Sequence, residues 1–130
     1  MAIYPPELKY TKDHEWARVE EGLVRIGITA YAADQLGDVT LVDLPPAGTQ
    51  VQTQEQFGDI ESVKTVSEIF APIGGEIVET NAELETSPEL VNESPYESGW
   101  MVLIKPSDPV ELSRLMDATG YEDFVGTLDH

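Results

Sequence analysis

The chain has 130 residues, of which 25 are Asp or Glu and 7 are Lys or Arg, so its formal net charge is −18. A surface this acidic repels phosphate backbones and anionic lipids, which argues against nucleic-acid and membrane binding. Hydrophobic residues make up 41% and are spread along the chain, so one packed domain over residues 1–130 is expected and disorder is not.

The first predicted elements are a β-hairpin and a short helix. Glu15–Glu20 and Leu23–Ile28 are strand-like and flank a Glu-Gly turn. Thr29 is suited to cap a helix over Ala30–Leu36, and Gly37 is suited to the left-handed position that ends it. This order places a helix directly after the second strand of the hairpin.

Strands also dominate the middle of the chain. Asp38–Leu44 has apolar residues on both of its alternating faces, which predicts a strand buried on both sides. Gly75–Thr80 and Trp100–Lys105 are further predicted strands, and a short helical segment is expected from Asn81 to about Glu85. Short strands separated by Gly and Pro turns favour a β-sandwich or a small barrel.

The clearest helix signal lies near the C-terminus. Asp108 is a good N-cap, Pro109 follows at the first helical position, and Glu111 stands where a capping-box residue belongs. The apolar spacing continues from there, so a helix is expected until Gly120, with an additional turn over Tyr121–Val125.

No catalytic constellation is recognisable. The chain has no cysteine, which excludes disulfides, a thiol nucleophile and a cysteine metal site. His14 and Glu15 are adjacent, but no HExxH, G-x-S-x-G or EF-hand pattern is present. The carboxylate-rich runs are best interpreted as solvated surface, and no metal site is predicted.

Lys64 is the only basic residue between Arg25 and Lys105, among fourteen acidic ones. Charge alone favours chance as the explanation. Glu61 lies three residues before this lysine and Gly75 eleven after it, within the A-P-x-x-G-E-I stretch. These features resemble the lipoyl-acceptor hairpin of swinging-arm carrier domains. Biotin acceptors typically have Met on both sides of the lysine, whereas this one is flanked by Val and Thr.

The resemblance extends over about 120 residues, to the H protein of the glycine cleavage system. It is carried by the blocks KYTKDHEWARV, GITAYAADQLGDV, VDLPPAGT, FGDIESVKTVSEIFAPIGGEIVETN, SPELVNESPYESGWMVLIKP and the terminal L-M-D-A-x-x-Y-E pattern. These blocks occur in the family's order, which makes the match specific.

The resemblance implies a mainly β fold of lipoyl/biotinyl-carrier type, a flattened barrel or sandwich of two antiparallel sheets, with a few short helices including a C-terminal one. Its lipoyl-binding region would span about residues 23–105. Lys64 would carry lipoic acid in amide linkage, with Glu61 and Gly75 recognised during lipoylation. The protein would be a non-catalytic carrier. Without a recognisable targeting segment it is expected in the bacterial cytoplasm, or in the mitochondrial matrix for a mature eukaryotic chain.

The implied role is to shuttle the aminomethyl group of decarboxylated glycine from the P protein (glycine decarboxylase) to the T protein (aminomethyltransferase). The L protein (dihydrolipoyl dehydrogenase) would reoxidise the arm, and a lipoylating enzyme would attach it. The loaded arm is expected to fold into a cleft with Glu15, Glu68 and Asp13, where carboxylates would offset a cationic amine. At Gln35 some relatives carry a His that contacts the arm.

Other readings stay open from the residues alone. Ser62 in Glu-Ser-Val faintly resembles the acceptor triplet of phosphopantetheine carriers, although those are helical bundles. The acidic face could also serve an unmodified interaction module, or the chain could mainly donate lipoate to other enzymes. A monomer is the expected state for a carrier of this charge.

Overall fold

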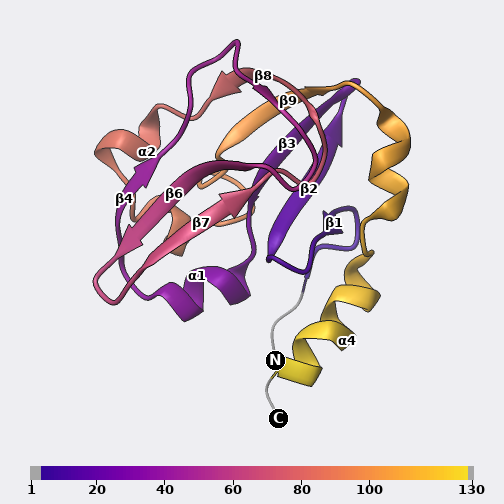
Figure 1. The fold of residues 1–130 in the computed structure, drawn as a ribbon. Helices are drawn as coiled ribbons and strands as arrows, with labels where there is room; N and C mark the ends of the chain where they lie inside the picture. The colour runs from indigo at the N-terminus through magenta and orange to yellow at the C-terminus, as the bar shows by residue number, and fades with distance from the viewer. Residues whose placement is uncertain (1–3, 129–130) are drawn as a thin grey trace.

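The computed structural model describes residues 4–128, which form two antiparallel β-sheets with short helices around them (Figure 1). The larger sheet has the strand order β1-β2-β3-β9-β8-β5. Its strands are β1 (Lys9–Tyr10), β2 (Glu15–Glu20), β3 (Leu23–Ile28), β5 (Gln50–Val51), β8 (Gly75–Thr80) and β9 (Val102–Pro106).

The smaller sheet has the order β4-β6-β7, with β4 (Val39–Asp43), β6 (Gln56–Ser62) and β7 (Val66–Phe70). Apolar residues from both sheets, including Ile26, Ile60, Ile69 and Ile104, form one buried core. The fold is therefore mainly β, as predicted, and of the two expected forms it is the sandwich, because the described sheets do not close into a barrel.

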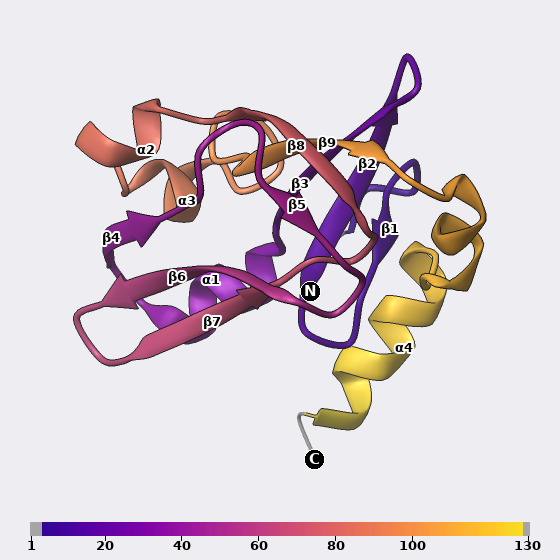
Figure 2. The same cartoon turned by 45° about the horizontal axis from the view of Figure 1, so that its top comes forward.

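Short helices connect and flank the sheets: α1 (Ala30–Leu36), α2 (Glu83–Thr86), α3 (Leu90–Glu93), a 3₁₀ helix η1 (Pro109–Arg114) and α4 (Ala118–Leu128). Figure 2 shows α1 lying beside the β6–β7 hairpin. The start of α1 is as predicted, since the Thr29 hydroxyl accepts a hydrogen bond from the Ala32 N–H. Gly37 ends the helix with φ of 75°, which favours glycine.

A second cluster of buried aromatic residues packs α4 against the strand β1. Tyr10 and Tyr121 stack with ring centroids 4.7 Å apart, and both are fully buried. The Trp16 side chain belongs to the same cluster. This cluster fixes the segment between β1 and β2, which carries Asp13 and His14.

The strand predicted over Asp38–Leu44 is wrong in one respect, because it is not buried on both sides. Val39 and Val42 are buried, whereas Leu41 is 48% exposed. The pairing register with β6 shifts between Val39 and Leu41. This irregularity turns Val39 and Val42 to the same side despite their odd spacing, which strict alternation did not anticipate.

The predicted C-terminal helix is also divided differently. The turn that Asp108 caps is a 3₁₀ helix ending at Arg114, and Gly120 lies inside α4. Asp117 starts α4, since its carboxylate accepts a hydrogen bond from the Gly120 N–H at 2.8 Å. The Glu111 carboxylate instead accepts from the Gly74 N–H and the Thr53 hydroxyl, tying η1 to the larger sheet.

Candidate functional site

Lys64 lies in the turn that joins β6 to β7, at the tip of the hairpin. The Ser62 hydroxyl oxygen accepts hydrogen bonds from the N–H groups of Lys64 and Thr65, both at 3.2 Å. The Ser62 N–H donates to the Thr65 carbonyl at 2.8 Å. A serine turn of this kind explains how a Val-Lys-Thr sequence forms a reversal without Gly or Asn.

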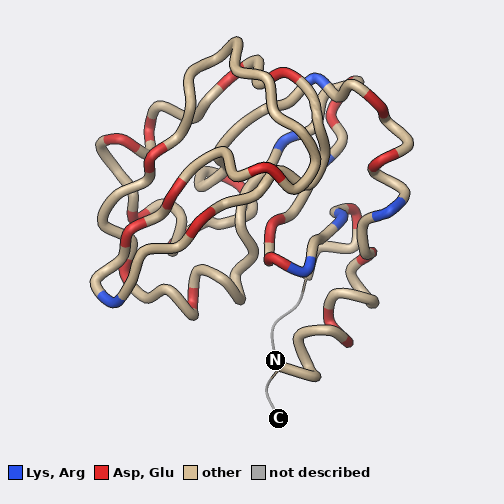
Figure 3. The backbone as a smooth tube through the Cα atoms, viewed as in Figure 1, with Lys and Arg blue, Asp and Glu red and all other residues tan. Residues whose placement is uncertain are grey.

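The lysine is presented to solvent. Lys64 is exposed, as are the nearby Val63 and Val66 at 67% and 60%. Figure 3 shows a single blue segment at this hairpin tip. Within residues 4–128, Lys64 takes part in none of the ion pairs, which involve Arg18 and Arg25. Its aliphatic stem lies over Gly37, where an added Cβ would come 3.2 Å from Lys64 Cε.

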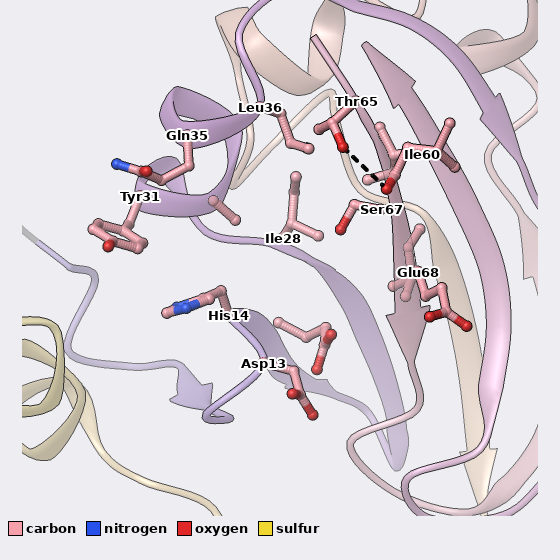
Figure 4. A pocket seen from close by; sticks show the side chains of 14 residues that line it. Asp13, His14, Ile28, Tyr31, Gln35, Leu36, Ile60, Thr65, Ser67 and Glu68 are labelled. Atoms are coloured by element: carbon pink, nitrogen blue, oxygen red, sulfur yellow. Dashed lines mark hydrogen bonds between the residues drawn. The ribbon is translucent and has the colours of Figure 1, made fainter. Parts of the chain in front are cut away.

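A cleft of about 380 Å³ opens beside the tip, between α1, β7 and the segment before β2 (Figure 4). Thr65 and Val66, directly after the lysine, belong to its lining. The remaining lining residues are Asp13, His14, Glu15, Ile28, Tyr31, Ala32, Gln35, Leu36, Ile60, Ser67, Glu68 and Ile69. The structure thus brings together all three carboxylates expected at an arm cleft, and Gln35 with them.

The three carboxylates differ in their surroundings. Glu15 is only 2% exposed, whereas Asp13 and Glu68 are exposed. In Figure 4 Ser67 points toward Ile28, while the Glu68 carboxylate points away from Asp13. This follows from the alternation of side chains along β7. Glu15 is therefore the inner acid of the cleft, and Asp13 and Glu68 are at its edge.

Burial raises the pKa of Glu15 to about 7. The Thr11 hydroxyl donates a hydrogen bond to its carboxylate at 2.6 Å, and the Phe70 N–H donates at 3.4 Å. These two bonds oppose the effect of burial, while the nearby charge of Asp13 adds to it. The net result is a carboxyl group poised to gain or lose a proton near neutral pH.

The comparisons with known proteins agree with one another. The family model described as "Glycine cleavage H-protein" matches residues 8–127. The chain belongs to the glycine cleavage H-protein family. Glycine cleavage system H proteins from Oceanobacillus iheyensis and Geobacillus kaustophilus are 53% and 54% identical over 121 residues, covering 93% of this chain and 96% and 95% of the relatives.

A solved structure supports the same conclusion. The crystal structure of a glycine cleavage system H protein from Mycobacterium marinum aligns with a TM-score of 0.86 at 34% identity. The alignment covers 98% of this chain and all of the other. As a member of the H-protein family, the chain has the family's role of lipoyl carrier in glycine cleavage, with other proteins of that system as its partners.

The two residues that the family resemblance assigns to lipoylation lie in different places. Glu61 is exposed on β6, opposite Val66 and close to the tip. Gly75 is buried at the start of β8 in the other sheet, where it pairs with Val51 and Pro106. A Cβ at Gly75 would collide with the Lys105 carbonyl oxygen. Close packing is therefore sufficient to require glycine there.

His14 serves the architecture of the H-protein cleft. Its Nδ1 is 2.7 Å from the Tyr121 hydroxyl, which also hydrogen bonds to Thr29, and its ring lies beside Tyr31. Burial lowers the pKa of His14, so the neutral form is favoured. No cluster of three metal-ligating side chains exists within residues 4–128.

Sequence reasoning missed the apolar floor of the cleft. Ile28, Leu36 and Ile60 line it, from β3, α1 and β6 respectively. Ile28 and Leu36 were expected only as members of a strand and of a helix, and Ile60 was given no structural role. Which residues border a cleft depends on how α1 packs against the hairpin, which local patterns do not encode.

No helix in the described part of the chain has the length and apolarity needed to cross a bilayer.

Proposed function

We propose that lipoic acid is attached to Nζ of Lys64 in amide linkage. The observation that supports this proposal is the position of Lys64, the one lysine at the tip of the β6–β7 hairpin, exposed and beside a cleft. When bound, the lipoyl group supplies dithiol chemistry, which this cysteine-free chain lacks. The chain's own residues present the arm and shelter it.

The cleft fits a loaded arm. Thr65 and Val66 start its lining next to the attachment point, and Ile28, Leu36 and Ile60 supply an apolar wall. Glu15, with Asp13 and Glu68 at the edge, would offset the charge of a cationic amine. Gln35 would replace the contact that a His makes in some relatives.

In this proposal the arm receives an aminomethyl group from the P protein, passes it to the T protein and is reoxidised by the L protein. The chain itself is non-catalytic. We propose a monomeric single domain over residues 1–130, with its lipoyl-binding region at about 23–105. Because the similar proteins named above are bacterial, we propose the bacterial cytoplasm as its location, with the mitochondrial matrix as the eukaryotic equivalent.

A lipoylating enzyme must recognise the tip before any of these steps. Glu61 is exposed on β6, three residues before Lys64, so its carboxylate is accessible to such an enzyme. For Gly75 we propose that recognition is indirect, because the residue is buried and shapes β8. Substituting Glu61 should therefore slow lipoylation without unfolding the protein. Substituting Gly75 should slow lipoylation and also destabilise the fold.

Lys64 is the residue whose replacement should abolish lipoylation. Co-expression with a lipoylating enzyme should add one lipoyl mass to the wild-type chain and none to Lys64→Arg, as measured by intact mass spectrometry. Lys12→Arg is the matched control, since Lys12 is also exposed and should leave the modification intact. A lipoyl mass on Lys64→Arg would refute the assignment, and a phosphopantetheine mass on Ser62 would support the alternative carrier class.

A further inference from the structure

Glu15 faces the cleft without a cationic partner. The residue is 2% exposed, and its carboxylate accepts hydrogen bonds from the Thr11 hydroxyl and the Phe70 N–H. The described lining of the cleft includes no Lys or Arg. An ionised carboxylate buried without a counter-ion is costly, so the empty cleft favours the protonated form of Glu15.

Asp13 reinforces this preference, because its negative charge on the same segment raises the pKa of Glu15. Glu68 from β7 lines the edge of the cleft and is exposed to solvent. His14 is kept neutral by burial. The contributions of α1, β3 and β6 to the lining are uncharged. A cation entering the cleft would therefore stabilise the ionised form of Glu15 and favour release of its proton.

We propose that Glu15 makes the cleft selective for a cationic arm, by releasing its proton to solvent when an ammonium group enters. The exchange converts a neutral carboxyl and an ammonium ion into a carboxylate–ammonium pair and one free proton, with no other bond changed. An oxidised or reduced lipoyl arm carries no ammonium and gains no such pair. This inference rests on the proposed attachment of the arm at Lys64 and adds how its cleft is regulated.

Proton release makes docking dependent on pH. At pH values below the pKa of Glu15 in the empty cleft, about 7, docking of a cationic arm must remove a proton, so its equilibrium constant falls by up to tenfold per pH unit. Above that pKa the proton is already gone and docking no longer varies. Docking of an uncharged arm should not strengthen as the pH rises.

The absence of cysteine permits a clean test. The reduced arm of the lipoylated protein is singly alkylated, either with 2-bromoethylamine to give a cationic aminoethyl group or with 2-iodoethanol to give a neutral hydroxyethyl group. Amide NMR signals of Ser67 and Tyr31, which line the cleft, report docking. We expect the aminoethyl arm to dock about five times more strongly at pH 7 than at pH 6, because the ionised fraction of a group with a pKa of about 7 changes by this factor. The hydroxyethyl arm should show no such increase.

Two variants distinguish the role of Glu15 from that of the other carboxylates. Glu15→Gln should remove the pH dependence of the aminoethyl arm, whereas Glu68→Gln, which changes a carboxylate at the rim, should weaken docking without moving the pH midpoint. Carbon NMR of the Glu15 carboxyl in the unmodified chain should give a titration near neutrality. An ordinary carboxyl titration, or equal docking of the aminoethyl arm at pH 5.5 and 8, overturns this inference alone. A chain that gains no lipoyl mass overturns the proposed attachment instead.

Discussion

At the scale of single residues, the site depends on side chains that satisfy the backbone of a short turn and on one carboxyl group held away from water. The Ser62 hydroxyl stabilises the tip of the hairpin by accepting hydrogen bonds from the N–H groups of Lys64 and Thr65. Glu15 has the opposite character, since its burial costs stability whenever it is ionised. A residue that lowers stability while lining a cleft is expected where function, rather than folding, selects it.

The cost of Glu15 should be measurable. Its pKa is raised from 4.5 in the unfolded chain to about 7 in the fold, so the folded state binds the proton more tightly. The resulting stability is complete below about pH 4.5 and is lost as the pH rises through 7. Glu15→Gln keeps the shape without the charge. We expect it to match the wild type at pH 5 and to exceed its free energy of unfolding by ~1–3 kcal/mol at pH 8.

Urea unfolding of both proteins at the two pH values provides the measurement. Glu61→Gln is the comparison variant, because Glu61 is exposed on β6 and should show no pH-dependent difference of this size. If Glu15→Gln were less stable than the wild type at pH 8, the ionised carboxylate would have an unrecognised partner and the burial argument would be wrong.

At the scale of elements, local signals predicted what local interactions determine. The bounds of β2, β3, β8 and α1 agree with the sequence analysis, because alternation, a Thr cap and a C-terminal glycine are short-range features. The irregularity in β4 and the separate start of α4 were missed. The first depends on pairing with β6. The second begins at a local cap, the Asp117 carboxylate, which the interpretation of Gly120 as a helix end overlooked.

The candidate site divides in the same way. The family motif indicated Lys64 and the carboxylates, and the structure gathers the carboxylates around one cleft. Their inequality was not predictable, because the depth of Glu15 depends on β7 and its Phe70 N–H, fifty-five residues away. The same holds for Gly75, whose close approach to Lys105 is visible only in the sheet.

The Asn92 side chain connects three elements. From α3 its side-chain amide donates to the carbonyls of Ala33 and Gly37 at the end of α1, and its oxygen accepts from the Val39 N–H of β4. Asn92→Ala leaves these partly buried groups unpaired and should lower the free energy of unfolding by about 1–3 kcal/mol. Asn92→Asp retains the acceptor but places a carboxylate oxygen against two carbonyl oxygens. It should therefore be no more stable than Asn92→Ala.

Denaturant titration measures this loss, and hydrogen exchange at the Gly37 amide locates it at the end of α1. Glu93→Ala, an exposed position on the same short helix, should change stability by less than about 0.5 kcal/mol. Equal stability of Asn92→Ala and the wild type would show that water replaces the amide, and that α1 is positioned by its apolar face alone.

At the scale of the whole molecule, the excess of 25 acids over 7 bases creates one negative field. Lysine and arginine segments are few in Figure 3, and the hairpin tip carries one of them. Amide formation at Lys64 would remove that charge and take the formal net charge from −18 to −19. The modified arm would then extend from a uniformly acidic hairpin toward any partner with a basic rim.

This field should act on folding and on association in opposite directions as salt is added. Self-repulsion at −18 destabilises the compact state, so screening should raise the melting temperature of the isolated chain.

Long-range attraction to a basic enzyme surface accelerates encounter. The same screening should therefore lower the association rate constant while leaving dissociation much less affected. Thermal melts and stopped-flow binding to the aminomethyltransferase, between 20 mM and 500 mM NaCl, measure both effects. Sucrose, an uncharged stabiliser, should raise the melting temperature without slowing association. An association rate that is insensitive to salt while the melting temperature rises would mean that apolar contacts around Val63 and Val66, both exposed beside the lysine, govern encounter instead.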